Sequence, residues 1–123
     1  MEQREFEAVV DEFGTDVQDL VELIETARYE QATAVEISRL LDAREDLLVL
    51  VNKLPALRAA EAPASMNVPL ASLRERIAHA REALRSSHDS KEILQMVAET
   101  GETFANIVAP LQAAGRWPKG RSR

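Results

Sequence analysis

The chain has 123 residues, a net charge of −6 and no cysteine, so it can form one domain but offers no thiol for disulfides, metal sites or nucleophilic catalysis. Hydrophobic residues make up 46% of the chain and charged residues 29%, a balance typical of folded rather than disordered proteins. No apolar run reaches the length of a membrane span, and no apolar leader follows the first residue, so we expect a cytoplasmic protein that does not enter membranes.

Helical periodicity in the hydrophobic pattern extends along nearly the whole chain, and no run alternates with the period of a strand. We therefore expect an all-α fold, a single-domain bundle of four to five mostly antiparallel helices at 1–115. A first short helix is predicted at 3–13, where an apolar stripe stops at Gly14. Thr15 and Gln18 then have the spacing of a capping box, which predicts the start of a second helix.

Neither Gly nor Pro occurs between Gly14 and Pro55, so this stretch contains either one long helix or two. Thr33 and Glu36 form a second pair in capping-box spacing, which favours a break just before Thr33. The helix after this break, at 34–54, is expected to end at Pro55, because proline lacks the N–H group that a helix interior needs.

The second half of the chain predicts a connection and two more helices. Residues 56–69 are rich in Ala and Pro and have the composition of a connection. Helices are expected at 69–86 and 90–114 from their apolar stripes. Gly101 lies inside the latter helix and indicates a close approach of another helix there, and Gly115 is expected to end it.

The stretch Leu47–Val51 is apolar on nearly every side of its helix, and such a segment is either buried on several sides or lies at an interface. No coherent catalytic constellation accompanies it. The sequence therefore favours a non-enzymatic interaction or assembly module that self-associates or binds another protein, as an adaptor or a small subunit, with no cofactor. The expected partner-binding residues are Leu47, Leu50, Val51, Trp117 and Arg121.

One enzymatic alternative is a ribonuclease. Arg74 and His79 have the Arg-x4-His spacing, which resembles the signature of the HEPN ribonucleases, dimeric helical bundles that cleave RNA. The resemblance covers six residues, and Glu75 stands where that family often has Asn. It implies that His79 moves a proton while Arg74 stabilises the charged phosphorane. Helical geometry places His79 about 140° from the apolar stripe of its helix, so we expect it to be exposed.

A second enzymatic alternative is a nucleotide hydrolase. Glu22 and Glu25 form a Glu-x-x-Glu pair that resembles the first half of the pattern in all-α nucleotide pyrophosphohydrolases. Glu45 lies in a stretch similar to that family's next helix, although the second half of the pattern is reversed here, with Asp42 before Glu45. The resemblance implies that Glu22, Glu25 and Glu45 hold magnesium against a pyrophosphate. The interaction module, in contrast, needs no metal.

Two arginines, Arg28 and Arg44, interrupt apolar stripes. A buried arginine needs an acidic partner, because an unpaired buried charge costs several kcal/mol. Each side chain is therefore expected either to extend toward water at the edge of its stripe or to form an ion pair between helices or subunits.

Charge is distributed unevenly along the chain: residues 1–46 carry −10, residues 47–115 are neutral, and the tail at 116–123 carries +4. The acidic body disfavours broad binding to nucleic-acid phosphates, so we expect nucleic acid, if bound, to contact only the tail. Trp117 is the sole tryptophan, and a large indole is poorly placed in water. We expect it to pack back onto the bundle or onto a neighbouring subunit, with the basic residues facing the acidic surface.

Overall fold

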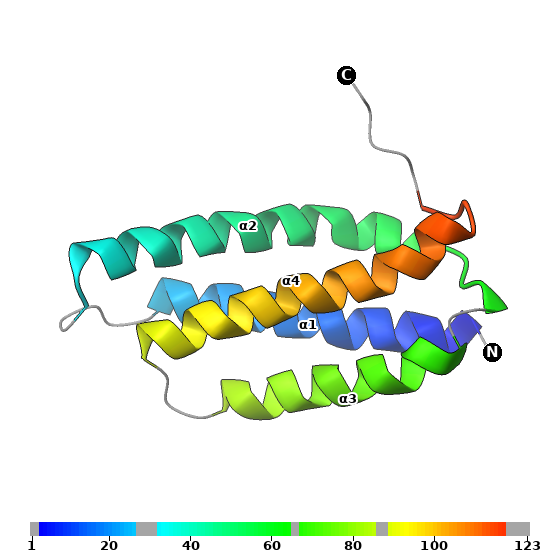
Figure 1. Ribbon diagram of the computed structural model, residues 1–123, viewed down its shortest axis with the longest axis horizontal. Helices are drawn as coiled ribbons and strands as arrows, with labels where there is room; N and C mark the ends of the chain where they lie inside the picture. The colour runs from blue at the N-terminus through cyan, green and yellow to red at the C-terminus, as the bar shows by residue number, and fades with distance from the viewer. Residues whose placement is uncertain (1–2, 27–31, 65–66, 86–88, 118–123) are drawn as a thin grey trace, which may run out of the picture.

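Four helices account for most of the chain in the computed structural model, which describes residues 3–26, 32–64, 67–85 and 89–117. They are α1 (Gln3–Thr26), α2 (Ala34–Ala59), α3 (Asn67–Leu84) and α4 (Ser90–Ala113). No strand occurs in these ranges, and the four helices lie side by side as a bundle (Figure 1). The predicted all-α bundle is confirmed, with four helices. None of the helices in the described ranges is long and apolar enough to cross a membrane.

Around the bundle the helices follow the order α1, α2, α4, α3. The two helices of each pair that a short loop joins, α1 with α2 and α3 with α4, run antiparallel, as predicted (Figure 1). The two pairs pack against each other so that α1 runs parallel to α3 and α2 runs parallel to α4. The step from α2 to α3 therefore crosses the diagonal of the bundle.

The core lies along the axis of the bundle and takes side chains from all four helices. Burying one such aliphatic or aromatic side chain contributes about 1.5–3 kcal/mol to folding, so this shared core is what holds the helices together. Its largest fully buried members are Phe6, Val9, Phe13, Leu20, Ile24, Leu40, Leu47, Leu57, Leu73, Ile107 and Leu111.

The helices predicted at 3–13 and after Thr15 are a single helix, so the expected stop at Gly14 is wrong. Gly14 is buried against α2, and a Cβ atom built on it would lie 3.3 Å from Cδ1 of Leu54. The residue therefore allows a close approach of two helices and does not end one. Thr15 is no N-cap either, because its hydroxyl donates to the carbonyl of Asp11 within the same helix, at 3.1 Å.

The predicted break before Thr33 is confirmed. α1 ends at Thr26 and α2 begins at Ala34, with Thr33 as its N-cap. The Glu36 N–H donates to the Thr33 hydroxyl at 3.1 Å, and the Thr33 N–H donates to the Glu36 carboxylate at 2.9 Å. These two bonds satisfy backbone donors that a helix start leaves without partners, which is why two residues suffice to place this boundary.

Pro55 lies inside α2, so the expected helix end at this residue is wrong. The helix continues to Ala59, and Leu57, two residues from its end, is fully buried. Burial of Leu57 offsets the hydrogen bond that proline cannot make. The connection predicted at 56–69 is correspondingly shorter, since α2 occupies its start and α3 its end.

The last helix differs from expectation at one glycine and agrees at the other. Gly101 is exposed, and a Cβ atom built on it would meet no atom within 4 Å, so the predicted close approach there is wrong. Helices approach closely at Gly14 instead. Gly115 has φ of +70°, the left-handed conformation that commonly ends helices, and it directly follows the C-cap of α4 as predicted.

Candidate functional site

The apolar stretch Leu47–Val51 is divided between core and surface. Leu47 is fully buried, so it belongs to the core and cannot contact a partner as we expected. Leu50 and Val51 are half-buried and pack against the core, and Val49 is 50% exposed. The expected surplus of apolar surface on this helix exists, but it lies on a different face from Leu47.

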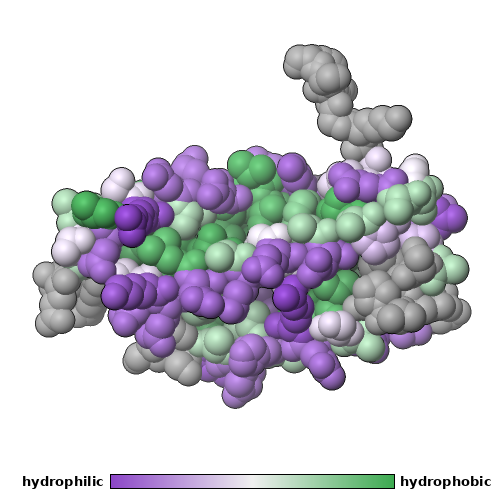
Figure 2. All heavy atoms as spheres, in the orientation of Figure 1, coloured by the Kyte–Doolittle hydropathy of each residue, from purple (hydrophilic) through white to green (hydrophobic). Residues whose placement is uncertain are grey.

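Three large hydrophobic side chains are about half exposed or more in the described ranges, and all three lie on α2. They are Val35, Leu41 and Val49, at 59%, 51% and 50% exposure. At 100° per residue they fall within an arc of about 120°, which we call the α2 outer face. Figure 2 shows hydrophobic residues gathered over α2 and along its seam with α4, bordered by hydrophilic ones. Sequence periodicity placed Leu41 beside buried Leu40 and did not reveal that it faces outward.

Trp117 packs back onto the bundle, as predicted. Its ring stands edge-on to Phe104 of α4, with 6.0 Å between ring centroids, and Phe104 stacks on Phe13 of α1 at 6.3 Å. The ammonium of Lys53 lies 5.8 Å from the centre of the Phe104 ring. The indole thus closes one end of an aromatic row that reaches into the core.

The described part of the basic tail also contacts the bundle. Arg116 donates to the carbonyl of Ala62 at 3.0 Å and lies 3.9 Å from a carboxylate oxygen of Glu61. These contacts attach the start of the tail to the connection that follows α2. The predicted partner residue Arg121 lies outside the described residues.

The ribonuclease candidates Arg74 and His79 are both exposed on α3, as expected for His79. Five positions on a helix separate side chains by about 140°, so the two point in different directions. Arg74 lies 3.4 Å from the carboxylate of Glu5 on α1, whereas His79 lines a groove between α3 and α4. Within one chain they do not share a site.

Two of the three magnesium candidates, Glu25 and Glu45, pair with the same arginine. Arg44 pairs with Glu25 of α1 at 2.7 Å and with Glu45 of its own helix at 3.2 Å, while Glu22 is exposed elsewhere. Among the described residues no three acidic or histidine side chains are grouped to hold a metal ion. Arg44 therefore forms the predicted ion pair between helices, and Arg28 lies outside the described residues.

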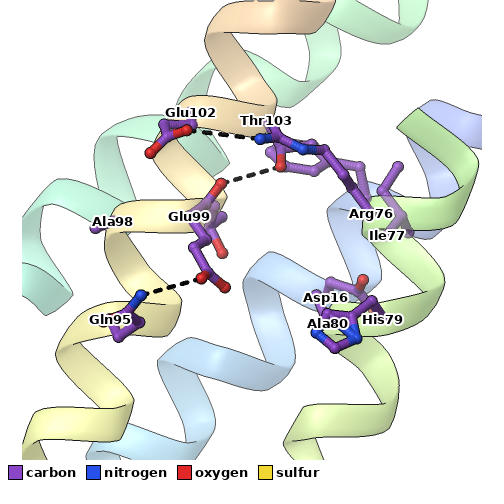
Figure 3. A pocket seen from close by; sticks show the side chains of 12 residues that line it. Asp16, Arg76, Ile77, His79, Ala80, Gln95, Ala98, Glu99, Glu102 and Thr103 are labelled. Carbon is purple, nitrogen blue, oxygen red and sulfur yellow. Dashed lines mark hydrogen bonds and ion pairs between the residues drawn. The ribbon is translucent and has the colours of Figure 1, made fainter. Parts of the chain in front are cut away.

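Sequence reasoning missed a groove of about 370 Å³ between α1, α3 and α4 (Figure 3). Its apolar wall comes from Phe13, Ile77, Ala80 and Ala98, and polar side chains surround this wall. The polar residues are Asp16, Arg76, His79, Gln95, Glu99, Thr100, Glu102 and Thr103.

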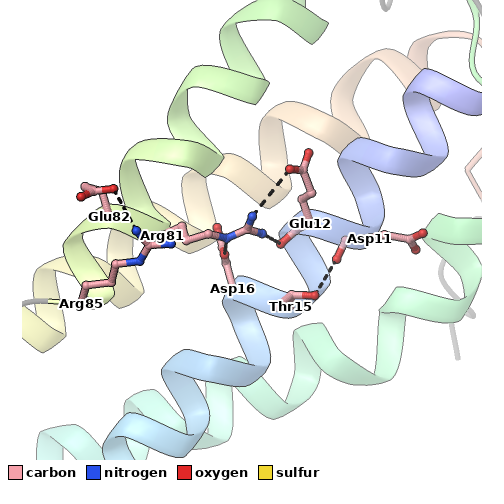
Figure 4. Close-up of polar contacts among 7 residues, drawn as sticks. All are labelled: Asp11, Glu12, Thr15, Asp16, Arg81, Glu82 and Arg85. Atoms are coloured by element: carbon pink, nitrogen blue, oxygen red, sulfur yellow. Dashed lines mark hydrogen bonds and ion pairs between the residues drawn. The ribbon is translucent and has the colours of Figure 1, made fainter.

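Asp16 is the buried acid of this groove, with only 5% of its surface exposed. The Nε of Arg81 donates to its Oδ1 at 3.3 Å, and Arg81 also reaches the carbonyl of Glu12 (Figure 4). The other oxygen, Oδ2, has no hydrogen-bond partner among the described residues. Burial raises the pKa of Asp16 from 3.8 to about 6, although the nearby Arg81 charge opposes this rise.

A signal for Asp16 was present in the sequence. It stands three residues after Phe13 and four before Leu20, the spacing that places side chains on one helix face. An acid at this spacing within an apolar stripe is as unusual as Arg28 and Arg44 are in theirs. The same reasoning, applied to acids, would have identified it.

Comparisons with family models, curated proteins and solved structures give no match for this chain. The α2 outer face and the groove beside Asp16 are therefore the features from which a function can be argued. They lie on different helices: the α2 outer face combines exposed hydrophobic side chains with the acids Asp42 and Glu45, whereas the groove surrounds an apolar wall with polar and charged side chains.

Proposed function

We propose that this chain is a non-enzymatic helical interaction module that self-associates through the α2 outer face. The observation that carries the proposal is that all the large, half-exposed hydrophobic side chains of the described ranges share one helix face. They extend from Val35 to Val49, about 21 Å at 1.5 Å per residue, which suits contact with a second helix. We also propose a cytoplasmic location, since a chain without cysteine gains nothing from an oxidising compartment.

The strength of this contact can be bounded from the exposed apolar area. Burying the exposed half of each side chain gives about 1 kcal/mol, or about 6 kcal/mol for three side chains from each of two copies. Association itself costs about 4 kcal/mol or more. The half-buried Leu50 and Val51 lie about 60° and about 80° outside this arc, toward the core, and add little area. The surplus of at most about 2 kcal/mol corresponds to a Kd of about 30 mM, so we expect weak association, in the millimolar range or above.

Charge makes this association sensitive to salt. The exposed acids Asp42 and Glu45 fall within the arc of about 120° of the α2 outer face, and the exposed Asp46 lies about 20° outside it. Two copies that meet through this face bring like charges together, and salt screens their repulsion. Self-association should accordingly strengthen as salt concentration rises, whereas contact with a basic partner protein should weaken.

Analytical ultracentrifugation over a wide concentration range, at low and high salt, tests the proposal. We expect a reversible increase in mass for the natural chain and a monomer for Leu41→Glu combined with Val49→Glu. A matched control, Ala105→Glu combined with Asn106→Glu, adds the same charge to an exposed part of α4 and should still associate. A natural chain that stays monomeric throughout, or equal effects of both double variants, would overturn the proposal.

Neither enzymatic alternative gains a comparable observation. Glu25 and Glu45 share the guanidinium of Arg44, and Arg74 is engaged with Glu5 across helices. The pairs Arg44–Glu25 and Arg74–Glu5 link neighbouring helices, and Arg44 also pairs with Glu45 within α2.

A further inference from the structure

We propose that the groove between α1, α3 and α4 binds a small arylalkyl amine, whose ammonium group pairs with Asp16 and whose ring lies against Phe13 and Ile77. This site is separate from the α2 outer face. Its occupant is defined by three properties of the groove: a buried oxygen without a partner, an apolar wall and an excess of carboxylates.

The unpartnered oxygen is the first argument. Asp16 is nearly fully buried, and it lines the groove together with His79 and Ala80 of α3 (Figure 3). Its Oδ2 accepts no hydrogen bond from the described residues, although buried carboxylate oxygens are normally satisfied. Because this oxygen has almost no surface open to the groove, a ligand donor would satisfy it after the Asp16 side chain turns its carboxylate toward the groove. Because the carboxylate is charged, a charged donor would form the stronger hydrogen bond.

The shape of the groove is the second argument. Its volume of about 370 Å³ is at the lower end of the range of small-molecule sites, about 300–1,000 Å³. Such sites combine an apolar lining with a few polar groups that orient the ligand. Here Phe13 and Ile77 are buried core residues, so the wall against which a ring would lie is part of the rigid bundle.

The balance of charge is the third argument, and it selects a cation. Asp16, Glu99 and Glu102 contribute three carboxylates to the groove. Arg76 pairs with Glu102 at 3.6 Å and Arg81 with Asp16 at 3.3 Å. Glu99 accepts from the Gln95 amide at 3.2 Å, and among the described residues it has no ion pair. The carboxylate of Glu99 therefore remains without a balancing positive charge. The electrostatic potential in the groove accordingly favours a positively charged ligand over an anion.

The experiment compares phenethylamine with its neutral analogue 2-phenylethanol, each titrated into the full chain and followed by two-dimensional NMR. We expect shifts at Ile77, Ala80 and Ala98 with the amine, and binding at least about tenfold weaker for the alcohol, since an ionic hydrogen bond is lost. Failure of the amine to shift these residues at millimolar concentration, or equal affinity for both compounds, would overturn the proposal.

Two variants and one control locate the site. Asp16→Asn should weaken amine binding about tenfold while leaving that of the alcohol unchanged, because only the charge is removed. Asp19→Asn, an exposed acid on the same helix, should change neither. Ala98→Leu fills the wall of the groove from an exposed position and should weaken both compounds without disturbing the fold. Amine binding by Asp16→Asn and Ala98→Leu as tight as by the natural chain would contradict the site.

Discussion

Asp16 and Arg81 form the one ion pair of the described residues that has a buried member: the acid is 5% exposed, whereas the arginine side chain is 36% exposed. The pair joins two helices that are far apart in sequence, with the charged acid on the inside and the base reaching in from the rim. A carboxylate in this position depends on its partner, because water cannot replace the arginine.

Removal of that partner should therefore destabilise the bundle. We expect Arg81→Ala to lower the free energy of unfolding by about 1–3 kcal/mol at neutral pH, the cost of leaving a buried acceptor unpaired. Urea denaturation followed by circular dichroism measures this change. Arg85→Ala is the matched control, since Arg85 is exposed and, among the described residues, pairs only with Glu82 three positions earlier on the same helix. This variant should cost less than about 0.5 kcal/mol. Equal losses for the two variants would contradict the prediction.

The raised pKa of Asp16 makes stability depend on pH with a definite sign. In the unfolded chain the carboxyl loses its proton near its ordinary pKa of 3.8, whereas in the fold it keeps the proton up to about pH 6. Between these values the folded state binds more protons, so the contribution of Asp16 to stability decreases as pH rises. Arg81 opposes this effect, and Glu12 and Asp19 reinforce it.

Asp16→Asn removes this titration. Relative to the natural chain, the variant should therefore gain stability as pH rises from about 4 to about 7, by an amount on the order of 2 kcal/mol. Urea denaturation of both proteins at several pH values gives the difference directly. A difference that stays constant with pH, or that changes in the opposite direction, would show that the Asp16 carboxyl titrates normally.

Gly14 and Gly101, the two glycines that lie inside helices of the described ranges, should differ in how replacement by alanine changes stability. Gly101→Ala adds a methyl group where no atom lies within 4 Å, so the unfolding free energy should rise by about 0.5–1 kcal/mol from helix propensity alone. Gly14→Ala gains the same propensity but places the methyl group 3.3 Å from Leu54. It should therefore gain distinctly less, and Gly14→Leu should destabilise by about 1–3 kcal/mol. Thermal unfolding of the three variants tests the order, and equal gains at Gly14 and Gly101 would refute it.

The contact of Trp117 with Phe104 predicts a fluorescence signal. Native emission should lie at a shorter wavelength than emission of the unfolded chain, because the indole is half-buried against an aromatic ring. Phe104→Ala should shift native emission to longer wavelength, whereas Asn106→Ala, an exposed change on the same helix, should not. Emission that is identical before and after unfolding would mean that the indole is fully in water.

The fold class could be predicted because helical periodicity and capping boxes are local signals. Thr33 and Glu36 lie three residues apart, and their hydrogen bonds need no other part of the chain. Gly14 and Pro55 were misjudged because packing across α1 and α2 outweighs their local preferences. The groove beside Asp16 could not be predicted, since it needs three helices in register, although the acid itself was visible within its stripe.

The contacts of this bundle fall into two groups. Those within each antiparallel helix pair join residues near in sequence, and those between the two pairs join residues far apart. Within α1–α2 and within α3–α4, partners are brought together by closing a short loop, which is fast and costs little chain entropy. The pair Asp16–Arg81, 65 residues apart, forms only when one hairpin docks on the other. Substitutions at this docking surface should therefore accelerate unfolding more than they slow folding, so the lifetime of the native state, rather than the speed of reaching it, is set where the two hairpins meet.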